Sequence, residues 1–329
     1  MGRAGHALVQ LTVSMRIAAI DIGTNTVQLL IADVEDHTVQ RRHVAERFVR
    51  LGEGIDARGR IGAAARDRLL DALQAHQTTI RAHRADQVVV AGTSALRDAT
   101  NRSSVRTAVE QEFGWTVEIL SGEEEAAWSF AAACDAIEED TRSCLVVDIG
   151  GGSTELISGR IPAAPHPHYP EAIRDRVSLP LGCVRLTERC FDRQPPTPGA
   201  VADATHLIQN TLSSAPLSVD PDPLVIGTAG TARALAHIHA GPHSTWDALH
   251  GTGFRLSHPD IHHWRKRLLQ LPVDDIRALH PDAMQGRADV FPVGVLLLDC
   301  LLDHVDQDAL RISPHELRHG LVLRQFAAS

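Results

Sequence analysis

Two segments of the chain share one pattern of apolar and polar positions. Residues 17–34 read IAAIDIGTNTVQLLIADV, and residues 145–159 read LVVDIGGGSTELISG. In each, an apolar run ends in Asp-Ile-Gly, and a short polar loop leads into a second apolar run. Apolar, β-branched runs on either side of a glycine turn predict β-hairpins. Asp21 and Asp148 would then stand where a strand enters a turn, and the repeat predicts two similar lobes that close on one phosphate-bearing ligand.

The rest of the chain alternates short apolar runs with segments of helical periodicity, which predicts an α/β fold. Strands are expected at residues 87–91, 117–120, 177–181, 224–226 and 310–312. Helices are expected at residues 62–84, 98–113, from 121, 182–191, 199–214, from 231, 284–305 and 314–326. Loops are expected at residues 46–60, which are rich in glycine and arginine, and at 161–173, which hold four prolines.

Composition narrows the possible ligands. The net charge of −9 argues against general binding to nucleic acid or membrane surfaces, although a local arginine cluster can still bind a polyanion. Lys266 is the only lysine, so an anion site must use arginine, backbone amides or a metal ion. The five cysteines lack metal-ligand spacing and suit a reducing cytosol. No apolar run approaches the roughly 18 residues of a membrane span. We therefore predict a cytoplasmic protein that binds neither nucleic acid nor membrane.

The loop of the first hairpin has the chemistry of a phosphate-binding turn. Gly23 lets backbone N–H groups approach an oxyanion closely, and Thr24, Asn25 and Thr26 add side-chain donors. The alternative is an ordinary hairpin turn with a capping Asp. A dinucleotide fingerprint is excluded, because a strand and not a helix follows the loop.

The second loop carries three consecutive glycines, which are costly between paired strands unless something must approach the backbone closely. They are Gly150, Gly151 and Gly152, and Ser153 follows them. Asp148 and Glu155 flank this loop, and their carboxylates are the hard oxygen ligands that Mg²⁺ prefers. We expect both side chains near solvent in the cleft. The alternative for Glu155 is a solvated strand residue without a ligand.

Three further segments are weaker candidates. A helix N-terminus favours anions, and one is expected after the loop that contains Gly227, Thr228, Gly230 and Thr231. Arg97, at the end of a similar turn, could make a forked contact to phosphate, or could simply be a surface residue. The glutamates at 123–125 open a helix, where acidic groups are stabilising even without a function, so catalysis and helix stabilisation stay open.

Taken together and in this order, the motifs resemble the exopolyphosphatase/guanosine pentaphosphate phosphohydrolase (Ppx/GppA) family of the actin-like ATPase superfamily. The resemblance runs from about residue 16 to the end, without the two further helical domains of the long members, which indicates a short form. The matching segments are DIGTN (21–25), GTSALRDATN (92–101), ILSGEEEA (119–126), VVDIGGGSTEL (146–156), SLPLGCVRLTE (178–188), GTAGTARALA (227–236), ADVFPVGVLLL (288–298) and SPHELRHGLV (313–322).

The resemblance implies an α/β fold of two actin-like, ribonuclease H-like lobes with the active site in the cleft between them. We expect lobe I at residues 15–126 and lobe II at 127–313, with the closing helix, 314–329, packed back on lobe I. Met15 directly precedes the first strand, so residues 1–14 are expected to be a disordered leader or an extension upstream of the true start.

The resemblance also implies roles for individual residues. Glu125 would activate the attacking water, and Asp148 and Glu155 would hold Mg²⁺ or Mn²⁺, with Asp21 as a further contributor. The phosphate-binding residues would be Thr24, Asn25, Thr26, Arg97, Gly150, Gly151, Gly152, Ser153, Gly227, Thr228, Gly230 and Thr231. The arginines expected along the substrate chain are Arg97, Arg185, Arg233 and Arg255.

The expected function is therefore hydrolysis of terminal orthophosphate from linear polyphosphate. A first alternative is hydrolysis of guanosine pentaphosphate to the tetraphosphate, which needs the same chemistry with another leaving group. Others are a nucleotide-dependent kinase on the same fold and a weakly active regulator that binds the alarmone. A homodimer is the expected assembly.

Overall fold

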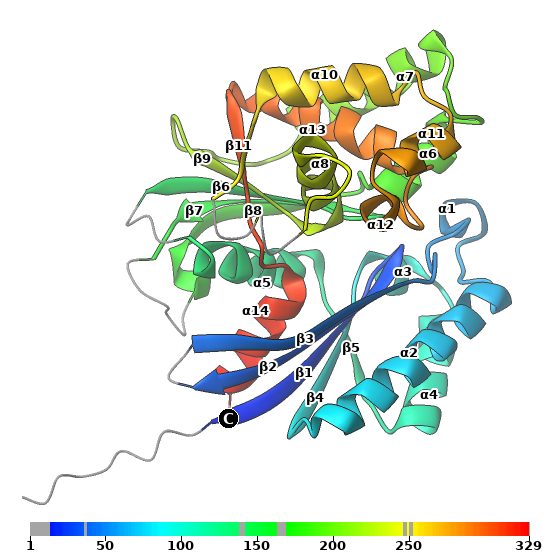
Figure 1. Ribbon diagram of the computed structural model, residues 1–329, viewed down its shortest axis with the longest axis vertical. Coiled ribbons are helices and arrows are strands. Elements are labelled where there is room, and N and C mark those ends of the chain that lie inside the picture. Colours follow the sequence, from blue (N-terminus) through cyan, green and yellow to red (C-terminus); the bar gives the residue numbers. More distant parts are fainter. Residues whose placement is uncertain are drawn as a thin grey trace, which may run out of the picture.

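The computed structural model describes residues 14–35, 38–137, 142–162, 169–245, 249 and 253–328. The expected leader lies outside these residues except for Ser14, and so do residues 163–168 of the expected loop at 161–173. The described chain folds into two β-sheets, with helices on the faces of each (Figure 1). None of the helices described is both long and apolar enough to cross a membrane.

The first sheet has the strand order β3-β2-β1-β4-β5. Its strands are β1 (Met15–Ile22), β2 (Thr26–Glu35), β3 (Thr38–Phe48), β4 (Gln87–Gly92) and β5 (Val117–Ile119). The first three are antiparallel neighbours, and β4 and β5 continue the sheet parallel to β1. Helices α2 (Ala63–His83) and α4 (Arg102–Phe113) cover one face through a shared apolar core. The short helices α1 (Ile55–Arg58) and α3 (Ser94–Asp98) lie near the cleft described below.

The second sheet has the strand order β10-β11-β9-β6-β7-β8. Its strands are β6 (Ser143–Ile149), β7 (Thr154–Arg160), β8 (Ile173–Leu179), β9 (Leu224–Thr228), β10 (Arg255–Ser257) and β11 (Ala309–Ile312). A 3₁₀ turn at Tyr169–Ala172 precedes β8. The helices of this half are α6 (Cys183–Cys190), α7 (Pro198–Ser213), α8 (Ala229–Ala240), α10 (His258–Leu268), α11 (Val273–Leu279), α12 (Pro281–Met284) and α13 (Phe291–Val305).

The two sheets repeat one topology. The order β8-β7-β6-β9-β11 matches β3-β2-β1-β4-β5 in both neighbour relations and strand directions. Both predicted hairpins are confirmed, and each supplies two neighbouring antiparallel strands in the interior of its sheet. In β1–β2, Asp21 pairs with Gln28, and in β6–β7, Asp148 pairs with Glu155. The two aspartates therefore occupy equivalent places, each beside the turn of its hairpin.

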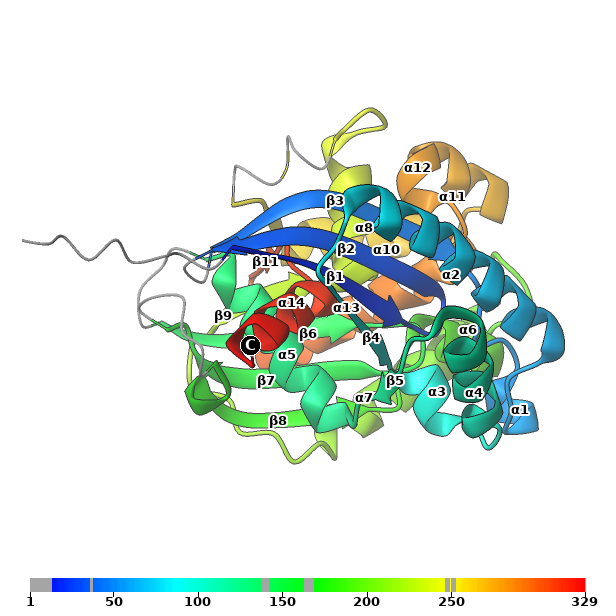
Figure 2. The same ribbon diagram turned by 90° about the horizontal axis from the view of Figure 1, so that it is seen from below.

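Two helices lie between the sheets and pack against each other (Figures 1 and 2). Helix α5 (Gly122–Asp135) packs on the second sheet, whereas α14 (Leu317–Ala327), the last helix, packs on β1 and β2 of the first. The expected lobe boundary at 126–127 thus falls inside α5. Because α5 packs on the second sheet and its Glu125 pairs with Arg97 of α3, the first turn of this helix contacts both halves.

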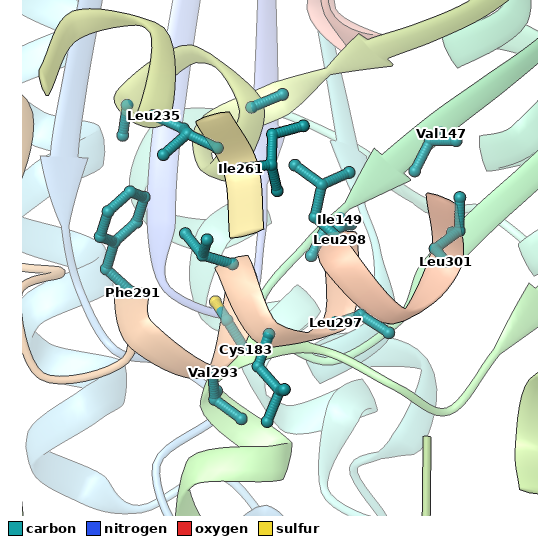
Figure 3. Close-up of a cluster of buried hydrophobic side chains, with 14 of the residues drawn as sticks. Val147, Ile149, Cys183, Leu235, Ile261, Phe291, Val293, Leu297, Leu298 and Leu301 are labelled. Atoms are coloured by element: carbon teal, nitrogen blue, oxygen red, sulfur yellow. The ribbon is translucent and has the colours of Figure 1, made fainter. Parts of the chain in front are cut away.

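The core of the second half is centred on α13, whose residues 291–302 are all buried. Figure 3 shows Leu298 and Leu301 of this helix beside Ile149 and Val147 of β6. A helix that is apolar on every side must be enclosed, and here the sheet and neighbouring helices enclose it. This packing fixes the strand that carries Asp148.

Three local expectations were wrong. The helix expected at 284–305 begins only at Phe291, because Gly286 has φ +62° and interrupts the helical backbone after α12. The loop expected at 46–60 contains the end of β3 and helix α1. The helix expected at 98–113 begins only at Arg102, as α4, and the residues before it form the short helix α3, which an extended Ala99 separates from α4. Strand β3 escaped detection because it is an edge strand with mostly exposed side chains and no apolar alternation.

Candidate functional site

A cleft opens where the turns of the two hairpins meet. Asp21 and Asp148, from opposite sheets, both line it, as the internal repeat predicts. Its walls include the β1–β2 turn (23–26), the β6–β7 turn (150–153) and the first residues of α8 (229–231). The cleft is therefore built from the equivalent ends of both sheets.

The glycine turn of the second sheet presses against the turn of the first. A Cβ on Gly151 would lie 2.9 Å from Cβ of Thr24, and a Cβ on Gly152 would lie 2.4 Å from Oγ of Ser94. Such distances leave no room for a side chain, so these glycines permit the contact between the two halves. The sequence suggested that these glycines let a ligand approach the backbone closely. The structure adds a second reason for them, because the opposite lobe also approaches this turn closely.

Helix α6 orients this turn. The carbonyl of Gly150 accepts from the N–H of Cys183, and the carbonyl of Gly151 accepts from Val184 and Arg185. Because C=O and N–H point in opposite directions in a trans peptide, the N–H groups of Gly151 and Gly152 point away from α6. This is the orientation that a backbone cradle for an anion requires.

Of the three glutamates in the first turn of α5, only Glu125 lines the cleft. Glu124 accepts from the N–H of Ser121 at 2.8 Å and completes a capping box, and Glu123, with 75% of its side chain exposed, pairs with Arg176. Consecutive helical residues are about 100° apart, so the three side chains leave the helix in different directions. Glu125 is buried, and Nη1 of Arg97 donates to it at 2.8 Å.

The cleft concentrates negative charge. Burial raises the pKa of Asp148 to about 7; the hydroxyl of Ser129, which donates to it at 2.7 Å, opposes the shift, and the charges of Glu125 and Glu316 add to it. Burial and the charges of Glu125 and Asp148 also raise the pKa of Asp21 well above its usual range. Burial raises the pKa of Glu125 as well, although Arg97 offsets part of the effect.

This arrangement fits a divalent cation. Oδ1 of Asp21 is buried and has no hydrogen-bond partner in the described part of the chain. Carboxylate oxygens are the donors that Mg²⁺ prefers, and a cation beside Asp21 and Asp148 would offset their mutual repulsion.

Comparison with known proteins agrees with this geometry. The sequence model of the Ppx/GppA phosphatase family matches residues 30–328. The chain belongs to the Ppx/GppA phosphatase family.

Two relatives illustrate the range of this family. Exopolyphosphatase 2 of Mycobacterium tuberculosis is 34% identical over 327 residues, which cover 94% of this chain and 98% of the relative. Guanosine-5'-triphosphate,3'-diphosphate pyrophosphatase of Vibrio parahaemolyticus is 30% identical over 311 residues, which cover 93% of this chain but only 58% of the relative. The chain thus matches the whole of one relative and a little over half of the other.

Solved structures give the same result for the fold. An exopolyphosphatase-like protein is 29% identical, with a TM-score of 0.85 over 95% of this chain and 98% of that one. An exopolyphosphatase from Cytophaga hutchinsonii is 27% identical, with a TM-score of 0.82 over 95% and 98%. The Ppx/GppA family member of Aquifex aeolicus is 26% identical, with a TM-score of 0.77 over 96% and 99%. The predicted fold class, two actin-like α/β lobes, is confirmed.

Glu155 does not lie where it was expected. It is 1% exposed and does not line the cleft, because β7 lies between β6 and β8 and Ser178 of β8 covers it with a 2.8 Å hydrogen bond. The expectation of a side chain near solvent was wrong, and so was the alternative of a solvated strand residue; Asp148 is also buried, at 7% exposed. Burial raises the pKa of Glu155 well above its usual range, and the charges of Glu125 and Asp148 add to this.

The expected phosphate-binding residues divide into three groups. Those that line the cleft are Thr24, Asn25, Thr26, Gly150, Gly151, Gly152, Ser153, Gly230 and Thr231. Arg97 lines an adjoining hollow, which shares Ser94, Gly152 and Ser153 with the cleft. Gly227 and Thr228 do not line the cleft: a Cβ on Gly227 would lie 2.8 Å from Leu310, and Thr228 is 1% exposed and donates to the carbonyl of His315.

The arginines expected along the substrate chain are mostly engaged in ion pairs. Arg185 pairs with Asp56 and Asp98, which joins α6 to α1 and α3 across the mouth of the cleft. Arg233 pairs with Glu46 and Glu316. Arg255 is exposed at the start of edge strand β10, away from the residues that line the cleft. Of these four arginines, Arg97 is the one that lies beside Glu125, in the position expected for a phosphate contact.

Sequence reasoning missed a charged cluster at the far end of the cleft. Glu46 accepts from Arg287 at 2.6 Å and from Arg233 at 3.2 Å, and Glu316 pairs with Arg233 and Arg318. Burial acts to raise the pKa of Glu46, but the two arginines outweigh it and lower that pKa. The five residues come from four distant segments, so no local pattern could have joined them.

Proposed function

We propose that this chain is a metal-dependent hydrolase that releases terminal orthophosphate from linear polyphosphate. The observation that carries the proposal is Glu125, a buried carboxylate that Arg97 holds and that lines the same cleft as the glycine turn and Asp148. The full-length similarity to exopolyphosphatase 2 supports the substrate class.

The proposed reaction is water attack in line on the terminal phosphorus. The new bond joins the water oxygen to phosphorus, the bridging P–O bond breaks, and the water proton passes to Glu125. The raised pKa of Glu125 suits a general base, because a base works best when its pKa approaches the working pH. The N–H groups of Gly151 and Gly152 would donate to the oxygens that gain charge.

Asp21 and Asp148 would hold Mg²⁺ or Mn²⁺, with Glu155 behind Asp148. A bound cation would neutralise charge on the phosphate oxygens and on the carboxylates. Because Glu155 is enclosed by Ser178, it would act mainly by setting the charge and position of Asp148.

A second candidate is removal of the 5′ γ-phosphate of guanosine pentaphosphate. The Vibrio relative supports it, and the groups that hold a terminal phosphate would serve both substrates equally. A kinase is a weaker candidate, because a buried carboxylate in the cleft, Glu125, suits the activation of water. A cytoplasmic location and a homodimeric assembly remain predictions. So does the alternative that the chain is a weakly active regulator that binds the alarmone.

The deciding experiment measures orthophosphate release from long-chain polyphosphate and from guanosine pentaphosphate, in parallel, while Mg²⁺ is titrated. We expect phosphate release to depend on Mg²⁺, and we expect kcat/KM to be larger for polyphosphate than for guanosine pentaphosphate. A larger kcat/KM on guanosine pentaphosphate would favour the second candidate. If folded protein releases orthophosphate from neither substrate in the presence of Mg²⁺ or Mn²⁺, the proposal that the chain is a hydrolase is refuted.

A further inference from the structure

Two imidazoles and a carboxylate meet where α5 crosses α14, outside the cleft. Asp135 ends α5, His319 lies in the first turn of α14, and His315 precedes that helix. Nε2 of His319 lies 2.7 Å from Oδ2 of Asp135, and Nδ1 of His315 lies 3.4 Å from the same oxygen. The two rings stack with their centroids 3.6 Å apart. Their donor atoms all lie within 4.8 Å of one another.

The local sequence has a spacing that suits a metal ion. Residues 315–319 read His-Glu-Leu-Arg-His, and a His-Glu-x-x-His segment within a helix can bring both imidazoles to one zinc ion. Here α14 begins only at Leu317, so His315 reaches the site from the segment before the helix, and its ring stacks on that of His319. In zinc hydrolases of that kind the glutamate acts as a base at the metal. Here Glu316 lines the phosphate cleft and pairs with Arg233 and Arg318. The segment therefore offers two ligands without a catalytic base beside them.

We propose that Asp135, His315 and His319 bind a divalent transition-metal ion, for which Zn²⁺ is the best match. Two imidazole nitrogens and one carboxylate oxygen form a common zinc donor set, whereas Mg²⁺ and Ca²⁺ prefer oxygen alone. Two Zn–ligand bonds of about 2.1 Å at a tetrahedral angle place their ligand atoms about 3.4 Å apart. The separation of His315 from Asp135 has this value, so small side-chain rotations would complete the site.

Such an ion would join the two halves of the molecule. α5 packs on the second sheet and α14 on the first, so a ligand from each helix would link the two lobes. The site also adjoins the cleft, because Glu316, which lines it, directly follows His315. Thr228, the last residue of β9, donates to the carbonyl of His315 at 2.7 Å. We therefore expect zinc to stabilise the fold and to restrain the lobes, separately from the Mg²⁺ chemistry proposed above.

A second group of similar residues supplies a matched control. His258, Asp299 and Asp303 also place their donor atoms close together. There, Nη1 of Arg265 lies 3.1 Å from Oδ2 of the buried Asp299 and already provides a cation. We expect this group to be a structural ion-pair network that does not compete for zinc.

The test is zinc binding to the chelator-treated full chain, measured by competition with a chromophoric chelator. One ion per chain should bind to the wild type and to His258→Gln. His315→Gln and His319→Gln should each weaken binding at least about 100-fold, because loss of an outer-shell partner alone costs up to that much. Co²⁺ should give the intense visible bands of a tetrahedral site in the wild type and lose them in both variants. At a free Zn²⁺ concentration of about 100 Kd, the wild-type Tm should rise by roughly 5 °C, and that of the variants should not.

Mg²⁺-dependent phosphate release and the metal-free Tm show whether each variant is folded. If His315→Gln does not fold, His319→Gln and Asp135→Asn decide the matter. Zinc bound equally tightly by folded His315→Gln and His319→Gln would overturn the proposal. Loss of binding in His258→Gln, or absence of tight binding in the wild type, would do the same.

Discussion

Replacing Glu125 by Gln is the sharpest test of the proposed chemistry. The substitution keeps the size of the side chain and an oxygen that can accept from Arg97, 2.8 Å away, but removes the base. General-base catalysis contributes about 10²–10⁴-fold, which corresponds to roughly 2.7–5.5 kcal/mol of activation free energy. We expect kcat to fall on this scale with little change in KM, because the phosphate cradle is untouched.

The same substitution, Glu125→Gln, should leave the stability of the fold unchanged or increase it. Burial raises the pKa of Glu125, which means that its negative charge is unfavourable in the folded protein. A neutral Gln also removes a charge that raises the pKa values of Asp21, Asp148 and Glu155. The Tm of the variant should therefore equal or exceed that of the wild type, so lost activity cannot be ascribed to unfolding.

The two neighbouring glutamates are matched controls in the same helical turn. Glu123→Gln removes only an exposed pair with Arg176, and such pairs contribute little. Glu124→Gln keeps the capping box, because Gln serves at that position as well as Glu. Orthophosphate release from polyphosphate is assayed for all three variants. The reasoning fails if Glu125→Gln keeps near-normal turnover, or if either neighbour loses as much.

Three further predictions concern the metal and the glycine turn. Asp148, with its pKa raised to about 7, contributes stability that is fully present below about pH 3.8 and lost as pH rises through 7. Asp148→Asn should therefore remove part of the fall in Tm that the metal-free protein shows over this pH range. An unchanged pH dependence of the Tm would contradict the raised pKa of Asp148. Glu155→Gln should raise the Mg²⁺ concentration for half-maximal phosphate release, and an identical Mg²⁺ titration would exclude it from the metal site. Gly151→Val should lose both activity and Tm, because its Cβ would lie 2.9 Å from Thr24, whereas Gly199→Ala meets nothing closer than 4.0 Å and should be neutral; an unaltered Tm for Gly151→Val would show that the turn is not tightly packed.

Much of the fold follows from patterns within short stretches of sequence. Both hairpins, the helix expected from residue 121 and the positions of Asp21 and Asp148 depend on neighbours within a few residues, and all were predicted correctly. The similarity of the two hairpins already indicated two lobes, and family resemblance supplied the actin-like arrangement. Glu125 was also singled out from the triplet by that resemblance, not by local physics.

The tertiary structure alone decided which charges meet. Glu46, Arg287 and Glu316 come together from segments more than 200 residues apart or on opposite lobes, and the burial of Glu155 depends on Ser178 of another strand. The cluster of Asp135 with His315 and His319 likewise exists only because α14 returns to pack on α5. Periodicity records whether a side chain faces a core, since burial of apolar surface is a local and non-directional preference. Periodicity does not show which residue a polar side chain will pair with. Hydrogen bonds and ion pairs depend on the distance between atoms, and the completed fold alone brings those atoms together.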